Sequence, residues 1–403
     1  MQDLRERLNQ SPLLHISNGS KELFHSNFLY WISSVNDFGD GYSGREAFAD
    51  LINFISQKTI LDNSTDWKVF REKEKFDLSV AQKTSKGKKY NDYILIIENK
   101  MKSIPSLSQL NEYDEKLQKS NPFKILLTLI TNFIGNKEIE EKGWKIISYE
   151  DLVNAIKKVL LPKLKNCYYW NLLVDYCDFM DNLMEYCKKF NISETSLYKI
   201  EEKEAEENNR LRISDLIRKL RTSLFAMMMQ KRIKDSGLDN YFHVTTGYTR
   251  TDAFLEIWYP ASKENVENIL NGGQLTAEQK EIKRKYKKFF VIEIQGDTYE
   301  HCIIPCSQEE EKDLSENYSS FFANSIREFQ SQRKDFFDGT KSKRNFLVFG
   351  NNNVNQRMAH QYAKIKDTTT IQQLIEYVIH DLENILNLTK NIEITEKSKT
   401  DKI

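Results

Sequence analysis

Residues 93–100, YILIIENK, decide the fold of the first part of the chain. The run from Tyr93 to Ile97 is apolar without a break, which is typical of a strand buried on both faces. It ends in Glu98, Asn99 and Lys100. Because side chains alternate along a strand, Glu98 and Lys100 share one face and Asn99 turns to the other. The stretch therefore predicts a buried strand that ends in a carboxylate and an amine.

The segments on either side of this strand predict an α/β domain with a central mixed sheet. Residues 67–82, WKVFREKEKFDLSVAQ, predict one extended strand or a hairpin with a sharp bend. Two helices are expected before it, one over 20–36 with Ser20 as its cap and one that starts at Ser43 in a capping box. After residue 100 the pattern predicts a helix over 106–119, strands over 124–131 and 144–148, and a helix over 149–160.

The remainder of the chain predicts a different organisation. Residues 165–236 are almost wholly helical in pattern, and Gly237 closes this region. From Tyr241 an alternating, strand-like pattern returns, and a final amphipathic helix is expected over about 370–387 before a frayed polar tail. We therefore expect a first domain over 1–164, a helical connector over 165–237, a C-terminal α+β domain over 238–389 and a tail over 390–403.

Composition limits the classes of protein that the chain can represent. The 59 basic and 59 acidic residues give a net charge of zero, so a nucleic-acid binder would need a local basic patch. There is no run of about 18 apolar residues and no apolar signal segment at the start, MQDLRERLNQ, so we expect a cytoplasmic protein without a membrane span. The five cysteines do not follow common metal-ligand spacing, and we interpret them as reduced, mostly buried thiols.

Asp77, Glu98 and Lys100 form the set of residues with the clearest chemistry. Hydrolysis of a phosphodiester requires stabilisation of extra negative charge on the phosphate, which a hard divalent ion with oxygen ligands provides. Two carboxylates on neighbouring strands supply such ligands, and the backbone carbonyl of Asn99 can supply a third oxygen. Lys100 shares a strand face with Glu98, so its ammonium can reach the attacking water or the phosphate. In isolation, Asp77 could also be a strand-end charge paired with Lys73 or Lys75.

This pattern resembles the PD-(D/E)xK nuclease superfamily over about residues 15–160. Phe76-Asp77 stands where the family usually has Pro-Asp, Glu98-Asn99-Lys100 matches E-x-K, and Gln109 with Tyr113 matches a Q-x-x-x-Y element. The resemblance implies a restriction-endonuclease-like fold, Mg2+ or Mn2+ as cofactor, and nucleic acid as partner, with DNA favoured over RNA. It also implies that Gln109 and Tyr113 steady the lysine and contact the substrate backbone, although the two could equally be an ordinary solvent-facing pair.

The opening helix resembles the start of a branch of uncharacterised bacterial proteins in this superfamily. The resemblance rests on Glu22, His25 and Ser26 in the sequence ELFHS. In such folds an acidic residue of the first helix often completes the metal site, which makes Glu22 the candidate. Two alternatives stay open: Glu22 is also favoured in a first helical turn by the helix dipole, and His25 is a common packing residue.

Lysine-rich segments offer candidate contacts to nucleic acid. Lys83, Lys86, Lys88 and Lys89 form the tip of the hairpin beside the predicted site, where they either contact a phosphate backbone or are simply solvated. The same two interpretations apply to the basic run 280–288, KEIKRKYKK.

The predicted function is a metal-dependent nuclease with Asp77, Glu98, Lys100, Gln109, Tyr113 and Glu22 in its site. Some related exonucleases carry an iron–sulphur cluster on cysteines that flank the nuclease core, but here no cysteine precedes residue 167, so no cluster is expected. Fusion to an unfamiliar domain suggests, by analogy, bacterial defence against foreign nucleic acid, and a homodimer is compatible with cutting two strands. The alternative is a silent nuclease-like module that binds nucleic acid or a protein, with the function in the C-terminal domain.

Overall fold

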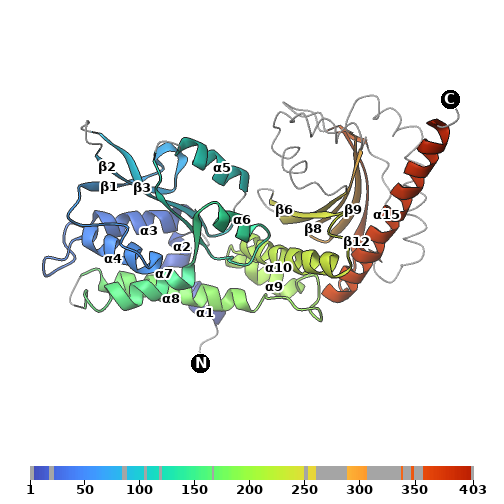
Figure 1. Ribbon diagram of the computed structural model, residues 1–403. Helices are drawn as coiled ribbons and strands as arrows, with labels where there is room; N and C mark the ends of the chain where they lie inside the picture. The colour runs from blue at the N-terminus through green and yellow to red at the C-terminus, as the bar shows by residue number, and fades with distance from the viewer. Residues whose placement is uncertain are drawn as a thin grey trace. The chain divides into compact units, whose positions relative to one another are not determined.

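The computed structural model describes residues 4–17, 22–83, 89–103, 107–117, 120–165, 168–248, 253–259, 288–305, 337–338, 346–348 and 357–400 of the 403-residue chain (Figure 1). The chain forms two compact units. The first comprises residues 1–191 with 202–220, and the second comprises residues 192–201 with 221–403. The predicted connector, 165–237, contributes to both units, and the predicted domain boundaries stay predictions.

The first unit contains the mixed sheet that the sequence predicted. Its strands are β1 (Trp67–Arg71), β2 (Leu78–Lys83), β3 (Tyr90–Lys100), β4 (Phe123–Thr128) and β5 (Trp144–Ser148), in that spatial order. β1, β2 and β3 pair antiparallel, so residues 67–83 form a hairpin rather than one strand. β3, β4 and β5 pair parallel. β3 is therefore the central strand, and its apolar run is buried as expected.

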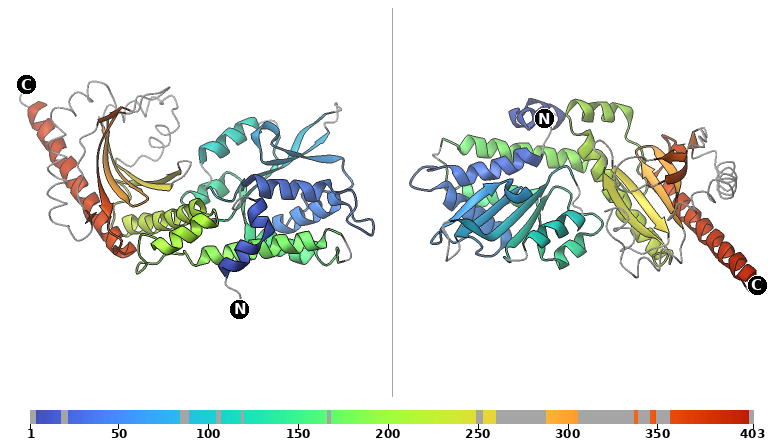
Figure 2. Two further views of the ribbon diagram at one scale, coloured as in Figure 1. Left: turned by 180° about the vertical axis from the view of Figure 1, so that it is seen from behind. Right: turned by 90° about the horizontal axis from the view of Figure 1, so that it is seen from above.

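Helices cover both faces of this sheet. Figures 1 and 2 show α3 (Glu22–Ser34), α4 (Gly44–Ser56), α7 (Tyr149–Ala155) and α8 (Trp170–Lys188) on one face and α5 (Leu107–Lys116) on the other. The predicted capping box is present, because Ser43 and Glu46 hold each other's backbone at the start of α4. The unit also contains α1 (Leu4–Gln10), α2 (Pro12–Ile16), α6 (Asn136–Glu141), the π-helical turn Ile156–Leu160 after α7, and α9 (Glu202–Arg210).

The helical stretch after residue 165 differs from the prediction in one place. Residues 189–201 are not helical between α8 and α9; instead Leu197 forms a β-bridge with Thr370. The backbone of this segment is satisfied by pairing with a distant part of the chain, which sequence pattern does not reveal. The acidic stretch EEKEAEENN itself forms α9, because Glu, Lys and Ala are good helix formers. α10 (Ser214–Asp235) follows, and Gly237 adopts a positive φ of 69° just beyond it.

The second unit contains an antiparallel sheet with the spatial order β10-β12-β9-β8-β7-β6, and β11 pairs with β12. The strands are β6 (His243–Tyr248), β7 (Ala253–Tyr259), β8 (Lys288–Gln295), β9 (Thr298–Pro305), β10 (Phe337–Asp338), β11 (Phe346–Val348) and β12 (Arg357–Ile365). The register places apolar residues such as Leu255 and Ile294 beside Tyr299 on one face. Glu256, Glu293 and Glu300 lie side by side on the other face. This strand-and-helix composition agrees with the predicted α+β class.

The last helix, α15 (Ile371–Thr400), packs on the apolar face of this sheet. Asp381 accepts a hydrogen bond of 2.6 Å from the Tyr299 hydroxyl and also pairs with Nε2 of His301, and all three side chains are buried. The helix continues to Thr400, so the predicted helix end at 387 was wrong, while the predicted polar tail over 390–403 stays a prediction. Residues 371–400 contain neither glycine nor proline, so nothing in the backbone stops the helix early.

Two further expectations concern the whole chain. Among the described residues, no helix is both long and apolar enough to cross a bilayer. Cys177 and Cys187 are free, buried thiols, as predicted, and burial raises the pKa of each to about 12. Cys167 and Cys306 lie outside the described residues, as does Ser20, the expected helix cap.

Candidate active site

A tight bend between β1 and β2 places Asp77 beside the end of β3. A short 3-10 turn over Lys73–Lys75 makes the bend, and Glu72, Glu74 and Lys75 all adopt positive φ, which is costly for residues with a side chain. The bend is supported from α5, because the Tyr113 hydroxyl donates to the carbonyl of Lys75 at 3.2 Å. Asp77 follows the buried Phe76 and is itself half-buried.

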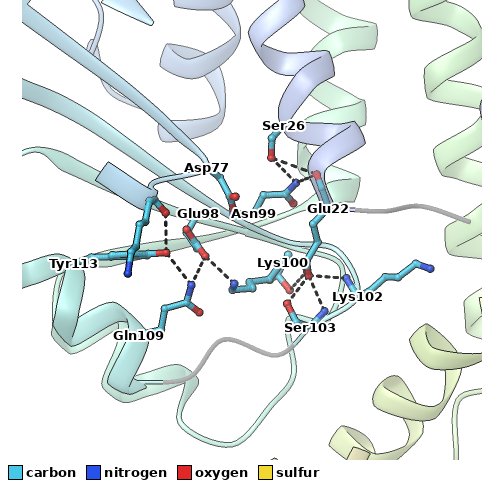
Figure 3. Close-up of polar contacts among 12 residues, drawn as sticks. Glu22, Ser26, Asp77, Glu98, Asn99, Lys100, Lys102, Ser103, Gln109 and Tyr113 are labelled. Atoms are coloured by element: carbon cyan, nitrogen blue, oxygen red, sulfur yellow. Dashed lines mark hydrogen bonds and ion pairs between the residues drawn. The ribbon is translucent and has the colours of Figure 1, made fainter. Parts of the chain in front are cut away.

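Glu98 and Lys100 lie on the same face of β3, as strand alternation predicted (Figure 3). The Lys100 Nζ is 2.7 Å from Oε1 of Glu98, and the two residues are only 8% and 2% exposed. The second carboxylate oxygen of Glu98, Oε2, is buried and has no hydrogen-bond partner among the described residues. A buried oxygen of this kind is costly unless something else satisfies it.

Gln109 and Tyr113 of α5 complete the network on this face. Nε2 of Gln109 donates to Oε1 of Glu98 and to the Tyr113 hydroxyl, at 2.8 Å each. Gln109 therefore contacts the carboxylate that pairs with Lys100. The implied contact of Tyr113 with substrate does not fit, because Tyr113 is 4% exposed and its ring packs against Phe76 and Trp144.

Asn99 faces the opposite side of the sheet, as expected from alternation. Its backbone N–H donates to Oδ2 of Asp77 at 2.7 Å, so it links the two strands that carry the carboxylates. Its side-chain amide donates to the carbonyl of Glu22 at 2.7 Å and to Oγ of Ser26 at 3.0 Å. Oδ1 of Asn99 accepts a hydrogen bond from the Tyr149 hydroxyl.

Glu22, at the start of α3, reaches the chain just after Lys100. Its Oε1 accepts hydrogen bonds from the backbone N–H groups of Lys102 and Ser103, at 3.2 and 3.0 Å, and from the Ser103 hydroxyl (Figure 3). One oxygen of the carboxylate is thus committed to holding the segment that follows β3. The negative charge of Glu22 still acts on the site, because it contributes to the pKa shifts of Asp77, Glu98 and Lys100.

His25 and Ser26 were predicted to contact nucleic acid, and the structure gives them a different place. Each is 1% exposed. Nδ1 of His25 lies 3.0 Å from the Tyr176 hydroxyl, and the ring packs among Phe24, Tyr149 and Phe179. Burial, followed by the charge of Lys102, lowers the pKa of His25 to about 3. Buried side chains cannot touch a bound strand directly, so that expectation is not retained for either residue.

The lysine-rich segments are only partly described. Lys83 forms a 2.6 Å ion pair with Asp66, and Lys89 is exposed at the start of β3. Lys86 and Lys88 lie outside the described residues, as does the run 280–287, while Lys288 begins β8. The predicted contacts of these lysines with nucleic acid stay predictions.

The buried charges influence one another strongly. Burial, and next the charge of Glu98, raises the pKa of Asp77 to about 7, although the N–H of Asn99 and the charge of Lys100 oppose the shift. Burial also raises the pKa of Glu98, against the opposing effect of Lys100. Burial alone would lower the pKa of Lys100, but the nearby carboxylates outweigh it and the net shift is upward. Lys100 is therefore charged, and the two carboxylates repel each other.

This arrangement fits a hard divalent cation. Glu98 presents an unpartnered buried oxygen, and Asp77 keeps Oδ1 in addition to the Oδ2 bonded by Asn99. Two crowded carboxylates whose ionisation is suppressed are what a divalent cation would stabilise. Among the described residues, no cluster of three or more His, Cys, Asp or Glu side chains has metal-binding geometry, so the remaining ligands would be backbone oxygens and water.

Several residues of this region escaped the sequence interpretation. Ser103 donates a hydrogen bond to Glu22, and Tyr149 donates one to Asn99. Lys102 forms a 3.3 Å ion pair with Asp215 of α10. None matches a motif. The one available signal for Ser103 was its position three residues after Lys100, which is too weak by itself.

The comparison with known families agrees with the geometry. Residues 10–178 match the family described as the PD-(D/E)XK nuclease superfamily. No curated protein and no solved structure matches the chain.

Proposed function

We propose that the first unit hydrolyses phosphodiester bonds in DNA with the help of a divalent cation, a proposal that the match of residues 10–178 to the PD-(D/E)XK nuclease superfamily supports. One observation carries this proposal. The buried Oε2 of Glu98 has no partner among the described residues, while Lys100 and Asp77 stand beside the same carboxylate. A carboxylate in this state is suited to binding a metal cation rather than to a purely structural role.

Asp77 and Glu98 would hold Mg2+ or Mn2+, with the Asn99 carbonyl as a further oxygen. When bound, the cation would neutralise charge on the scissile phosphate and lower the pKa of a coordinated water. Glu22 is a weaker candidate ligand, because its Oε1 already accepts three hydrogen bonds. Only its second oxygen could turn toward the cation.

Lys100 would stabilise the negative charge that develops on the phosphate. It is charged, and Glu98 holds its ammonium beside the two carboxylates, from where it would offset negative charge on a phosphate bound to the cation. Gln109 fixes the orientation of Glu98 through Oε1, which leaves Oε2 for the cation. In this proposal, Oε1 of Glu98 holds the carboxylate in place and Oε2 binds the cation.

The experiment is cleavage of a panel of labelled single- and double-stranded DNA and RNA by the full chain with Mg2+, Mn2+ or EDTA. We expect DNA cutting that requires metal and is lost in Asp77→Ala and Lys100→Ala. Lys137→Ala, which changes an exposed lysine of α6, is the matched control and should cut normally.

Cutting in EDTA, or cutting by both variants at the wild-type rate, would contradict the proposal. Cutting of RNA alone would keep the site and change the substrate. A folded wild type that cuts nothing, yet binds nucleic acid, would favour the alternative of a silent binding module. A defence role, a cytoplasmic location and a homodimer stay predictions.

A further inference from the structure

Asn99 occupies an unusual position between the two site residues of β3. It is 1% exposed, and its side chain points away from the site face. Both hydrogens of its amide are used, on the Glu22 carbonyl and on Ser26, and its oxygen accepts from Tyr149. Because all these hydrogen bonds are buried and satisfied, they hold the Asn99 side chain and the backbone of β3 beside it in one orientation.

The contacts of Asn99 join three elements to the end of β3. Glu22 and Ser26 belong to the first turns of α3, Tyr149 is the first residue of α7, and Asp77 precedes β2. The backbone N–H of Asn99 fixes one oxygen of Asp77, so the direction of the other oxygen depends on where Asn99 stands. The strand position of Asn99 is in turn set by the two helices.

Glu22 and Asn99 together clamp the segment that carries Lys100. The Asn99 amide holds the backbone carbonyl of Glu22, while the Glu22 side chain holds the N–H groups of Lys102 and Ser103. Lys100 lies between these two attachments. The backbone of Lys100 is therefore held on both sides, which keeps its ammonium within ion-pair distance of Glu98.

We propose that Asn99 is the positioning residue of the site: through its side-chain bonds to α3 and α7 it sets the orientation of Asp77 and the place of Lys100, without touching substrate or metal through its side chain. This inference rests on the proposed function. It assigns to the pair Glu22 and Ser26 a shared task as the anchor of Asn99. It also gives Ser26 of α3 a role, since Oγ of Ser26 accepts a hydrogen bond from the Asn99 amide.

The test measures Mn2+ binding by the full chain, by calorimetry without substrate, alongside kcat and KM for the DNA that the wild type cuts. Asn99→Leu removes all side-chain hydrogen bonds and keeps a side chain branched at Cγ with the same number of heavy atoms. Tyr149→Phe removes one donor and leaves the shape, so it serves if Asn99→Leu fails to fold. Thr65→Val, which alters an exposed loop hydroxyl outside the site, is the control for loss of a single hydrogen bond.

We expect the Mn2+ dissociation constant to rise about tenfold or more and kcat to fall about 10- to 100-fold in Asn99→Leu, with KM nearly unchanged. Tyr149→Phe should show smaller shifts in the same directions, and the control none. If the role of Asn99 were purely structural, Asn99→Leu would lower the melting temperature but leave metal affinity and kcat per folded molecule at wild-type values. That result would overturn this inference and leave the proposed function intact. A wild type that neither binds Mn2+ nor cuts, or whose Mn2+ binding survives Asp77→Ala, would overturn the proposed function and this inference with it.

Discussion

The Lys100 ammonium lies 2.7 Å from one oxygen of Glu98, while the other oxygen of the same carboxylate is buried without a partner among the described residues. An ion pair of two buried groups normally uses all the available oxygen capacity, because an unsatisfied buried charge is expensive. Because only Oε1 is paired with Lys100, Oε2 of Glu98 can still bind a cation. Asp77 lies close enough for its pKa to respond to Glu98, which makes a shared cation the natural occupant.

Gln109 should matter for rate because it holds the carboxylate that pairs with Lys100. Gln109→Leu removes the hydrogen bond to Oε1 of Glu98 and frees the carboxylate to rotate. We expect kcat to fall about 10- to 100-fold, as for other groups that orient a metal ligand. Single-turnover cleavage measures the change, with Glu112→Gln on the exposed side of the same helix as control. An unchanged rate in Gln109→Leu would show that Glu98 keeps its orientation without the amide.

Divalent metal should stabilise the folded protein. A cation that binds the native carboxylates and not the unfolded chain adds about 2.7 kcal/mol of stability at a concentration 100 times its dissociation constant. The melting temperature of the wild type should therefore rise with Mg2+ or Mn2+, and that of Asp77→Ala should not. Scanning fluorimetry measures both. Equal shifts in the two proteins would place the cation elsewhere.

In the metal-free protein, the contribution of Asp77 to stability should fall as pH rises toward neutrality. The pKa of Asp77 is about 7 in the folded state, against 3.8 for the free side chain, because burial and Glu98 disfavour its charge. Between pH 4 and 7 the folded state holds a proton that the unfolded state has lost. The contribution of this group to the free energy of unfolding is therefore fully present below pH 4 and is lost as pH rises through 7.

Asp77→Asn cannot titrate and isolates this effect. In EDTA, the free energy of unfolding of the variant minus that of the wild type should grow from pH 4 to 7 and reach roughly 2–4 kcal/mol, with screening by solvent taken into account. Urea unfolding at each pH gives the two values. A difference that is constant across this range would mean that Asp77 ionises normally.

His25 should remain neutral at every pH at which the protein is active. Its folded pKa of about 3 lies below the ordinary 6.5, so its contribution to stability is present above pH 6.5 and is lost as pH falls toward 3. The ring signals of His25 in NMR spectra should not titrate between pH 8 and 4. In the same range, exposed histidines titrate near 6.5. A His25 midpoint near that value would show that the ring is open to water and would restore it as a surface contact.

Much of the first unit could be predicted from sequence, because the signals there are local. The apolar run before Glu98 predicts a buried strand, and the spacing of Ser43 and Glu46 predicts a helix start; both are confirmed. The face shared by Glu98 and Lys100 follows from alternation alone. The match of residues 10–178 to the PD-(D/E)XK nuclease superfamily agrees with the resemblance expected from the sequence.

The contacts that organise the site could not be predicted, because they join residues far apart in the chain. Asn99 bonds to Glu22 and Ser26 more than seventy positions earlier and to Tyr149 fifty positions later. No periodicity encodes such pairs. The same reason applies to the burial of His25 and Tyr113, whose residue types suit a surface contact equally well until their neighbours are known.

The central claim is that Asp77, Glu98 and Lys100 form a metal-dependent hydrolytic site. Single-turnover cleavage of double-stranded DNA by Lys100→Met and by the wild type, each with saturating Mn2+, tests it most directly. Lys100→Met keeps much of the side-chain volume and removes the charge. The account predicts metal binding close to that of the wild type and a rate lower by at least about 100-fold. Cleavage by Lys100→Met at the wild-type rate would contradict it.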